Sequence, residues 1–156
     1  IVYPGYKANL TDIQAALGLH QLRKLDGFIA TRQAYARMYD QALANLIEIG
    51  TPLLHINRNH IYHIYAIRLQ YKGLKIDRGQ FIEELKTRQV GASVHFIPVH
   101  LHPYYQERFG YRMGSLPGAE YIYQGLVSLP LYPRMTEQDL QDVVEAVEEA
   151  IITNRR

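Results

Sequence analysis

A polar segment followed by a strongly apolar helical pattern opens the chain. Thr11 has the side chain of a helix N-cap, and Asp12 places negative charge in the first turn, where it is favoured. From Ile13 to Leu19, apolar or small residues cover nearly the whole circumference of a helix, which is typical of a helix buried on several faces. The pattern then narrows to one stripe. It predicts one long helix, or two nearly collinear helices, over about 11–46, with a bend at Gly27.

Shorter patterns of alternating type follow the long helix. Residues 60–70 are rich in β-branched and aromatic residues and predict a strand. Asp77 predicts the cap of a helix over about 78–89. The remaining expected elements are a strand over 92–96, a short helix over 104–109, a helix over 117–126, an extended edge strand over 128–133, and a helix from Thr136 to about residue 153.

This order of elements predicts the fold class. Helices that alternate with short strands indicate a small α/β or α+β unit, with helices packed on a sheet of three to four strands. The long first helix does not fit inside so small a unit, because it is apolar on more faces than one small sheet can cover. We therefore expect it to connect the unit to something larger. The start at Ile1, rather than at Met, also indicates one piece of a longer protein.

Composition narrows the function classes. The 156 residues include no cysteine, which excludes disulfides and thiolate metal sites. A net charge of +2 gives no support for nucleic acid as the main partner. No apolar run approaches the roughly 18 residues of a membrane span, and the first residues do not have the pattern of a signal peptide, so we expect a cytoplasmic protein. The 13 tyrosines suit either interfaces and wet pockets or a robust core.

Three histidines lie close together in the sequence, at the end of a predicted strand and in the loop that follows it. His95 ends the strand, and His100 and His102 lie in the loop, where functional sites are common. His100 and His102, with Glu107 after them, partly resemble the metal motif of cupins. Cupins are all-β, however, and Pro103 breaks the hairpin that they require. Loop packing and a supporting role at a substrate or cofactor pocket therefore stay open beside a metal site.

The sequence contains no local motif of a complete catalytic site. It has no phosphate-binding glycine motif, no nucleophile elbow and no H-E-x-x-H zinc motif. No candidate nucleophile has an attached base. Taken by themselves, the residues indicate a protein that binds and positions a ligand without a complete catalytic apparatus.

Four segments resemble motifs of one enzyme family, in the family's order. Residues 4–22 read Pro-Gly-Tyr-Lys-Ala-Asn-Leu-Thr-Asp-Ile-Gln-Ala-Ala-Leu-Gly-Leu-His-Gln-Leu. They resemble a signature of the DegT/StrS-type sugar aminotransferases, which use pyridoxal phosphate on nucleotide-linked keto-sugars. The K-x-N-L-T-D wording is most similar to members that make 4-amino-4-deoxy-L-arabinose for lipid A modification. The other matching segments are His63 to Arg68, Gly91 to His100 and Ser128 to Thr136.

The resemblance implies a fold and an assembly. The family has the pyridoxal-phosphate fold type I, usually as a homodimer with active sites at the dimer interface, and this chain would be its C-terminal part. Residues 1–47 would be the loop and long helix at the end of the large domain, on the interdomain and dimer seam. Residues 48–156 would be the C-terminal small domain. The implied partners are a second copy, a nucleotide-sugar substrate and an amino-acid donor such as glutamate, in amino-sugar, cell-surface polysaccharide or lipid A biosynthesis.

The resemblance also implies cofactor-binding residues. In the family, the segment that matches Tyr6, Lys7 and Asn9 reaches the partner subunit's active site, near the cofactor phosphate. An ammonium group and an amide can both donate hydrogen bonds to phosphate oxygens. Many relatives have Asn and Arg where this chain has Lys7 and Asn9, so either residue can be the one that meets the phosphate.

The implied substrate residues are His95, Phe96 and His100, which would border the sugar-nucleotide pocket. The family's Schiff-base lysine, cofactor-pairing acid and cofactor-stacking ring all lie upstream of the matching region. No catalytic residue is therefore assigned here, and the isolated chain is expected to be inactive, to bind pyridoxal phosphate weakly or not at all, and to self-associate through residues 13–19. The alternatives are a non-catalytic binding or oligomerisation module and a histidine-metal enzyme. None of the lysines outside the family motifs takes the Schiff-base role; these are Lys24, Lys72, Lys75 and Lys86.

Overall fold

The computed structural model describes residues 5–6 and 8–156 of the chain. Its centre is an antiparallel sheet with the strand order β1-β2-β3. In the register, Tyr65 lies opposite Leu129 and Ile67 lies opposite Val127. The number of strands agrees with the expected three to four, although the strands are not all the predicted ones. The strands are β1 (Ile49–Gly50), β2 (Tyr65–Leu69) and β3 (Leu126–Leu129).

Three helices share a core with one face of the sheet. Along β2 the residues Tyr65, Ile67 and Leu69 are buried, while the residues between them are half-buried, as expected for a strand with one core face. The rings of Tyr39 and Tyr65 lie 4.8 Å apart, and the hydroxyl of Tyr65 donates to Asp40 at 2.6 Å. Some of the tyrosines, such as Tyr39 and Tyr65, therefore pack in the core. The helices of this core are α2 (Leu25–Ala42), α3 (Arg78–Thr87) and α6 (Glu137–Asn154).

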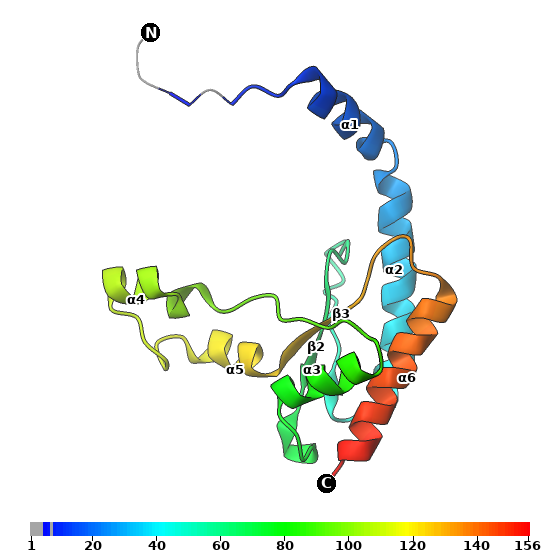
Figure 1. The fold of residues 1–156 in the computed structure, drawn as a ribbon, viewed down its shortest axis with the longest axis vertical. Coiled ribbons are helices and arrows are strands. Elements are labelled where there is room, and N and C mark those ends of the chain that lie inside the picture. Colours follow the sequence, from blue (N-terminus) through cyan, green and yellow to red (C-terminus); the bar gives the residue numbers. More distant parts are fainter. Residues whose placement is uncertain (1–4, 7) are drawn as a thin grey trace.

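The other helices extend from this body (Figure 1). Helix α1 (Asp12–Leu22) points away on one side. Helices α4 (Pro103–Phe109) and α5 (Pro117–Gly125) project on another side, and we call residues 103–125 the α4–α5 lobe. The single-turn 3-10 helices are η1 (Leu43–Asn45), η2 (Tyr71–Gly73) and η3 (Val99–Leu101).

Three helices begin at the cap residues that the sequence predicts. Thr11, Asp77 and Thr136 each cap a helix and form a capping box with the residue three positions later. These three predicted caps are confirmed. The predicted short helix before Gly110 and the helix that starts at Pro117 are also confirmed.

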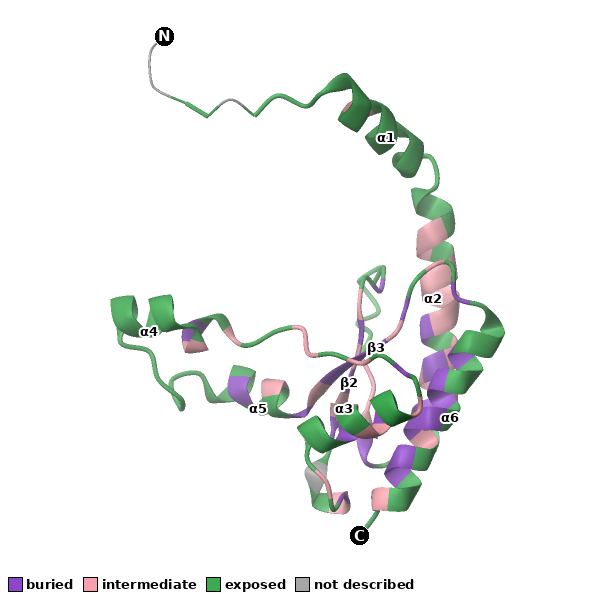
Figure 2. Cartoon of the chain, in the orientation of Figure 1, coloured by how far each residue is buried: buried purple, intermediate pink, exposed green. Residues whose placement is uncertain are grey.

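The predicted long helix is broken at a different place. The break lies at Arg23 and Lys24, between α1 and α2, whereas Gly27 lies inside α2. Helix α1 has no buried residue, and Ile13 is 76% exposed. Figure 2 shows the same helix exposed along its length. The apolar residues of 13–19 are thus uncovered in this chain, as was expected for a chain without the larger unit.

Two predicted strands differ from the structure. The strand expected over 60–70 begins at Tyr65, because Tyr62 adopts a positive φ of 47° and the guanidinium of Arg32 binds the carbonyls of Tyr62 and His63. The strand expected over 92–96 is reduced to a single bridge between Ser93 and Ser128.

The third strand is displaced, and the first was missed. The edge strand expected over 128–133 covers Leu126–Leu129 and ends before Pro130, which has no N–H for the ladder. The two residues of β1 were interpreted as part of a break, because so short a strand has no periodicity of its own. No helix in the described part of the chain has the length and apolar content that crossing a membrane requires.

Candidate functional site

The predicted substrate residues lie on a segment that is fixed at both ends, residues 93–100, which we call the site segment. At one end Ser93 and Ser128 exchange two backbone hydrogen bonds, of 3.2 and 2.7 Å. At the other end His100 Nε2 donates to Glu120 Oε1 at 2.8 Å. His95 and Phe96 lie between these anchors, in backbone without regular secondary structure. Two distant elements, β3 and α5, therefore determine where these side chains lie.

His95 and Phe96 line a cavity of about 440 Å³ at the edge of the sheet. The Nδ1 atom of His95 lies 3.3 Å from the hydroxyl of Ser93, and its ring meets the ring of Phe96 edge-on at 4.7 Å. Phe96 is 71% exposed, so its ring offers an apolar surface to a ligand. The cavity is also lined by His63, Ile64, Gly91, Ser93, Ser128, Leu129, Pro130 and Leu131.

Ser128 gives this cavity a buried polar group. The residue is 4% exposed, and its hydroxyl has no hydrogen-bond partner in the part of the chain that the structure describes. A buried hydroxyl without a partner is costly, so such a group favours a polar ligand or water beside it. The cavity therefore combines hydroxyl and imidazole groups with one exposed aromatic ring.

His100 differs from the other predicted substrate residues. It is 4% exposed, its Nε2 is bound by Glu120, and it does not line the cavity beside His95. It contributes instead to a second cavity of about 340 Å³, among the aromatic side chains of the α4–α5 lobe. The hydrogen bond from His100, followed by that from the Gly114 backbone, holds the pKa of the Glu120 carboxyl below its usual range.

The predicted cofactor segment lies elsewhere. Tyr6 and Asn9 are exposed, and Lys7 lies outside the described residues. Figure 1 shows α1, which follows this segment, lying away from the sheet that carries the His95 cavity. The lysines of the described chain are all exposed as well, which does not suit a covalently attached cofactor. The described residues therefore do not form an enclosed pyridoxal-phosphate pocket by themselves.

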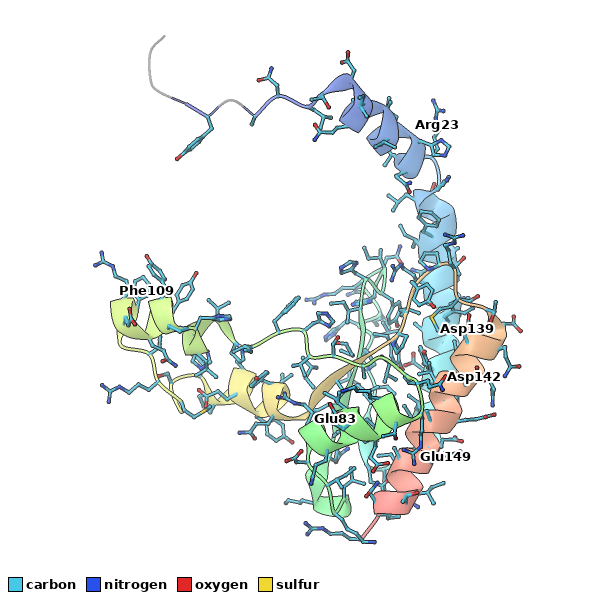
Figure 3. The ribbon with its side chains drawn as sticks, viewed as in Figure 1. Arg23, Glu83, Phe109, Asp139, Asp142 and Glu149 are labelled. Atoms are coloured by element: carbon cyan, nitrogen blue, oxygen red, sulfur yellow. The ribbon has the colours of Figure 1, made fainter. Side chains whose placement is uncertain are left out.

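The metal interpretation finds no set of ligands in the described residues. Within them, no three side chains of the types His, Cys, Asp and Glu lie close enough to share a metal ion. His100 has Glu120 as its partner, and His102 precedes α4 as an exposed N-cap. Figure 3 shows the acidic residues Asp139, Asp142 and Glu149 spread along α6. This helix is distant from α4, on which Phe109 lies.

Sequence reasoning missed Glu120, Ser93 and Ser128. Glu120 is 20 residues from His100 in the sequence, and no local spacing rule connects residues so far apart. The signal that could have indicated Glu120 is a carboxylate in the first turn of a short helix that follows several histidines and glycines. The two serines belong to matching motifs, but their proximity depends on the bridge between the site segment and β3.

Comparison with known proteins identifies the family. The profile of the DegT/DnrJ/EryC1/StrS aminotransferase family matches residues 2–148. The chain belongs to this family. Among its relatives is the spore coat polysaccharide biosynthesis protein SpsC of Bacillus subtilis, 44% identical over 149 residues that cover 95% of this chain and 38% of SpsC. The protein MJ1066 of Methanocaldococcus jannaschii is 45% identical over 155 residues, which cover 99% of this chain and 40% of MJ1066.

Solved aminotransferases have the same fold as this chain. PseC of Helicobacter pylori, an aminotransferase of pseudaminic acid biosynthesis, matches 98% of this chain and 40% of its own, with a TM-score of 0.88 and 26% identity. The sugar aminotransferase Spr1654 of Streptococcus pneumoniae, in its pyridoxal-phosphate form, matches 98% of this chain and 38% of its own, with a TM-score of 0.88 and 27% identity. The predicted fold class is confirmed. The chain spans about 40% of the length of the relatives that it matches.

Proposed function

We propose that this chain is the C-terminal part of a pyridoxal-phosphate-dependent aminotransferase that acts on a nucleotide-linked keto-sugar. The observation that carries the proposal is the family match over residues 2–148, in a chain that spans about 40% of its relatives. The neighbour Spr1654 is described as a sugar aminotransferase, and SpsC as a polysaccharide biosynthesis protein. Both names support a sugar as the substrate class.

The His95 cavity is proposed to hold part of the sugar nucleotide. Its imidazole and serine hydroxyls can donate and accept hydrogen bonds with sugar hydroxyls, and Phe96 can pack on an apolar ring face. Tyr6, Lys7 and Asn9 are proposed to approach the cofactor phosphate of a second subunit, an assignment that rests on the sequence motif. When bound, pyridoxal phosphate supplies the electron sink for amino transfer. Its lysine would come from a part of the protein outside this chain.

The first test compares the activity of the isolated chain with that of the full-length protein. We expect the full-length gene product to transfer an amino group from glutamate to a nucleotide-linked keto-sugar. The 156-residue chain with added pyridoxal phosphate should give no product. After borohydride reduction, absorbance and mass spectrometry should find no single lysine labelled stoichiometrically, because the described lysines are exposed amines that react with the cofactor only weakly and without selectivity. A stoichiometric adduct on the isolated chain would contradict this division. An inactive full-length protein would favour the non-catalytic binding module instead.

A pair of substitutions in the full-length protein tests the cavity. His95→Gln should lower kcat/KM for the sugar at least about tenfold, the value of one well-placed hydrogen bond. His55→Gln, at an exposed loop position, is the matched control and should leave it unchanged. Equal activity of the two variants would remove His95 from the proposed site.

We further propose that α1 forms the seam of a homodimer. Ile13 and Leu17 lie four positions apart on α1 and are 76% and 61% exposed, which is costly for a helix without a partner. The isolated chain should therefore self-associate in sedimentation at high concentration. Ile13→Gln with Leu17→Gln should shift it to the monomer, whereas Leu53→Gln with Ile56→Gln, at loop positions that are even more exposed, should not. A clean monomer of the unmodified chain would exclude the seam.

A further inference from the structure

We propose that Glu120 is a positioning residue that, through His100, sets the place of His95 and Phe96 at their cavity. The inference rests on the proposed function in one respect, since it takes this cavity as the sugar-nucleotide site. It assigns a role to a residue that no motif of the chain singled out. It also changes the interpretation of His100, from a residue that borders the substrate to one that orders the segment beside it.

The Glu120 carboxylate joins three separate parts of the chain. Oε1 accepts hydrogen bonds from His100 Nε2 at 2.8 Å, from the backbone N–H of Gly114 at 2.9 Å and from that of Leu116 at 3.1 Å. Oε2 accepts a second bond from the Gly114 N–H at 2.8 Å. The two side chains of the pair are only 4% and 8% exposed. A buried carboxylate with this many donors is bound far more firmly than a surface ion pair.

The loop between α4 and α5 is shaped around this carboxylate. Gly110 and Gly114 have positive φ values of 73° and 93°, which allow two sharp changes of direction within five residues. The second of these presents the Gly114 N–H to Glu120. The ring of Tyr111 packs edge-on against His100 at 6.2 Å and helps to exclude water from the pair. The α4–α5 lobe is thus built around the anchor of the site segment.

His100 transmits this order to His95 because the site segment is short. Ser93 is fixed to β3 by its two backbone hydrogen bonds, and His100 is fixed to α5 by Glu120. With both ends fixed, the residues between them have few conformations to adopt, even though the segment has no ladder of its own. Glu120→Gln removes the negative charge and sets an amide N–H2 group against the backbone N–H of the loop, so the hydrogen bonds to this side chain can no longer all be made. The weakened pair with His100 favours movement of η3 toward water. His95 and Phe96 then lose one of their two supports.

The proposal is tested on the 156-residue chain by NMR of ¹⁵N-labelled protein. Glu120→Gln should shift the imidazole signals of His100 and of His95 and the amide signal of Phe96, while those of His55 and His60 stay unchanged. Glu107→Gln, an exposed carboxylate on α4 of the same lobe, is the matched control and should shift none of them. A change confined to His100 would overturn the proposal, because it would show a pair without influence on the site segment.

A second pair of variants covers the case in which Glu120→Gln fails to fold. His100→Gln keeps an N–H donor near Glu120, whereas His100→Ala removes it. The signals of His95 and Phe96 should stay near their native positions in the first variant and shift in the second. Identical spectra for the two variants at these residues would overturn the proposal.

Kinetics of the full-length protein then separate this inference from the proposed function. Glu120→Gln should raise KM for the nucleotide-linked keto-sugar about tenfold, as expected for misplaced binding groups, with KM for the amino donor nearly unchanged. An equal rise in both values would contradict the positioning role. A protein without aminotransferase activity would refute the proposed function, while the NMR result would still decide whether Glu120 orders His95 and Phe96.

Discussion

Gly125→Ala is expected to destabilise the chain by about 3 kcal/mol, at the upper end of the cost of overpacking a core. A Cβ at this position would lie 2.6 Å from the carbonyl oxygen of Leu69 and 3.0 Å from Cγ of Arg68. The first contact is with backbone of β2, which cannot rotate away as a side chain can. Helix α5 must therefore move off the sheet, and the β2–β3 pairing that follows directly on Gly125 must move with it.

The free energy of unfolding in urea measures this effect, and the same helix provides the control. Gly118 is also in α5, but a Cβ there has open space around it. Gly118→Ala should cost nothing and add up to about 0.5 kcal/mol through the higher helix propensity of alanine. Equal stabilities of the two variants would show that α5 is not packed against β2 as described.

Arg155→Met is expected to cost about 2 kcal/mol, because it leaves a buried carboxylate without its partner. Glu48 is 2% exposed, and Arg155 binds it with two hydrogen bonds, from Nε at 2.7 Å and from Nη2 at 3.0 Å. The arginine side chain is 46% exposed, so water reaches part of the pair and the cost lies below that of a fully buried one. Arg156→Met, which removes one hydrogen bond to the Leu74 carbonyl, is the control and should cost less than half as much.

A double variant and a pH series check the cause. Glu48→Met combined with Arg155→Met should recover most of the lost stability, because no unpaired charge remains. The hydrogen bond from Arg155 is the largest influence on Glu48 and holds its pKa below the ordinary 4.5. The stabilisation by the pair is therefore present above about pH 4.5 and is lost as the pH falls through the lower pKa of the folded state. A stability difference between native chain and Arg155→Met that stays constant down to strongly acid pH would contradict this account.

Local sequence signals predicted the helices well and the strands poorly. The caps at Thr11, Asp77 and Thr136 could be predicted because each bond joins residues three positions apart. The strand ends depend on partners elsewhere in the chain. The start of β2 is decided by Arg32, about 30 residues away, whose guanidinium binds carbonyls that a ladder would otherwise use.

The site residues stay predictions, and the structure shows only how their side chains lie. His95 and Phe96 were expected at a pocket, and the structure places both on one cavity. His100 was grouped with them because the motif puts it five positions later, but its side chain turns to Glu120. The cofactor residues Tyr6, Lys7 and Asn9 stay a prediction from the motif. Tyr6 and Asn9 are exposed and are not among the residues that line the His95 cavity, and Lys7 lies outside the described residues.

The sequence by itself determined the family, the capped helices, the apolar character of α1 and the segment that carries His95. Each depends on residue types in a fixed local order, which can be read without knowing the fold. The tertiary structure decided which residues form strands, that His100 serves Glu120, and that Ser128 lies buried beside His95. Each of these depends on contacts between residues distant in sequence; the pair of Glu48 and Arg155 spans 107 positions. Burial and partner choice are properties of such contacts, so they appear only when the chain is folded.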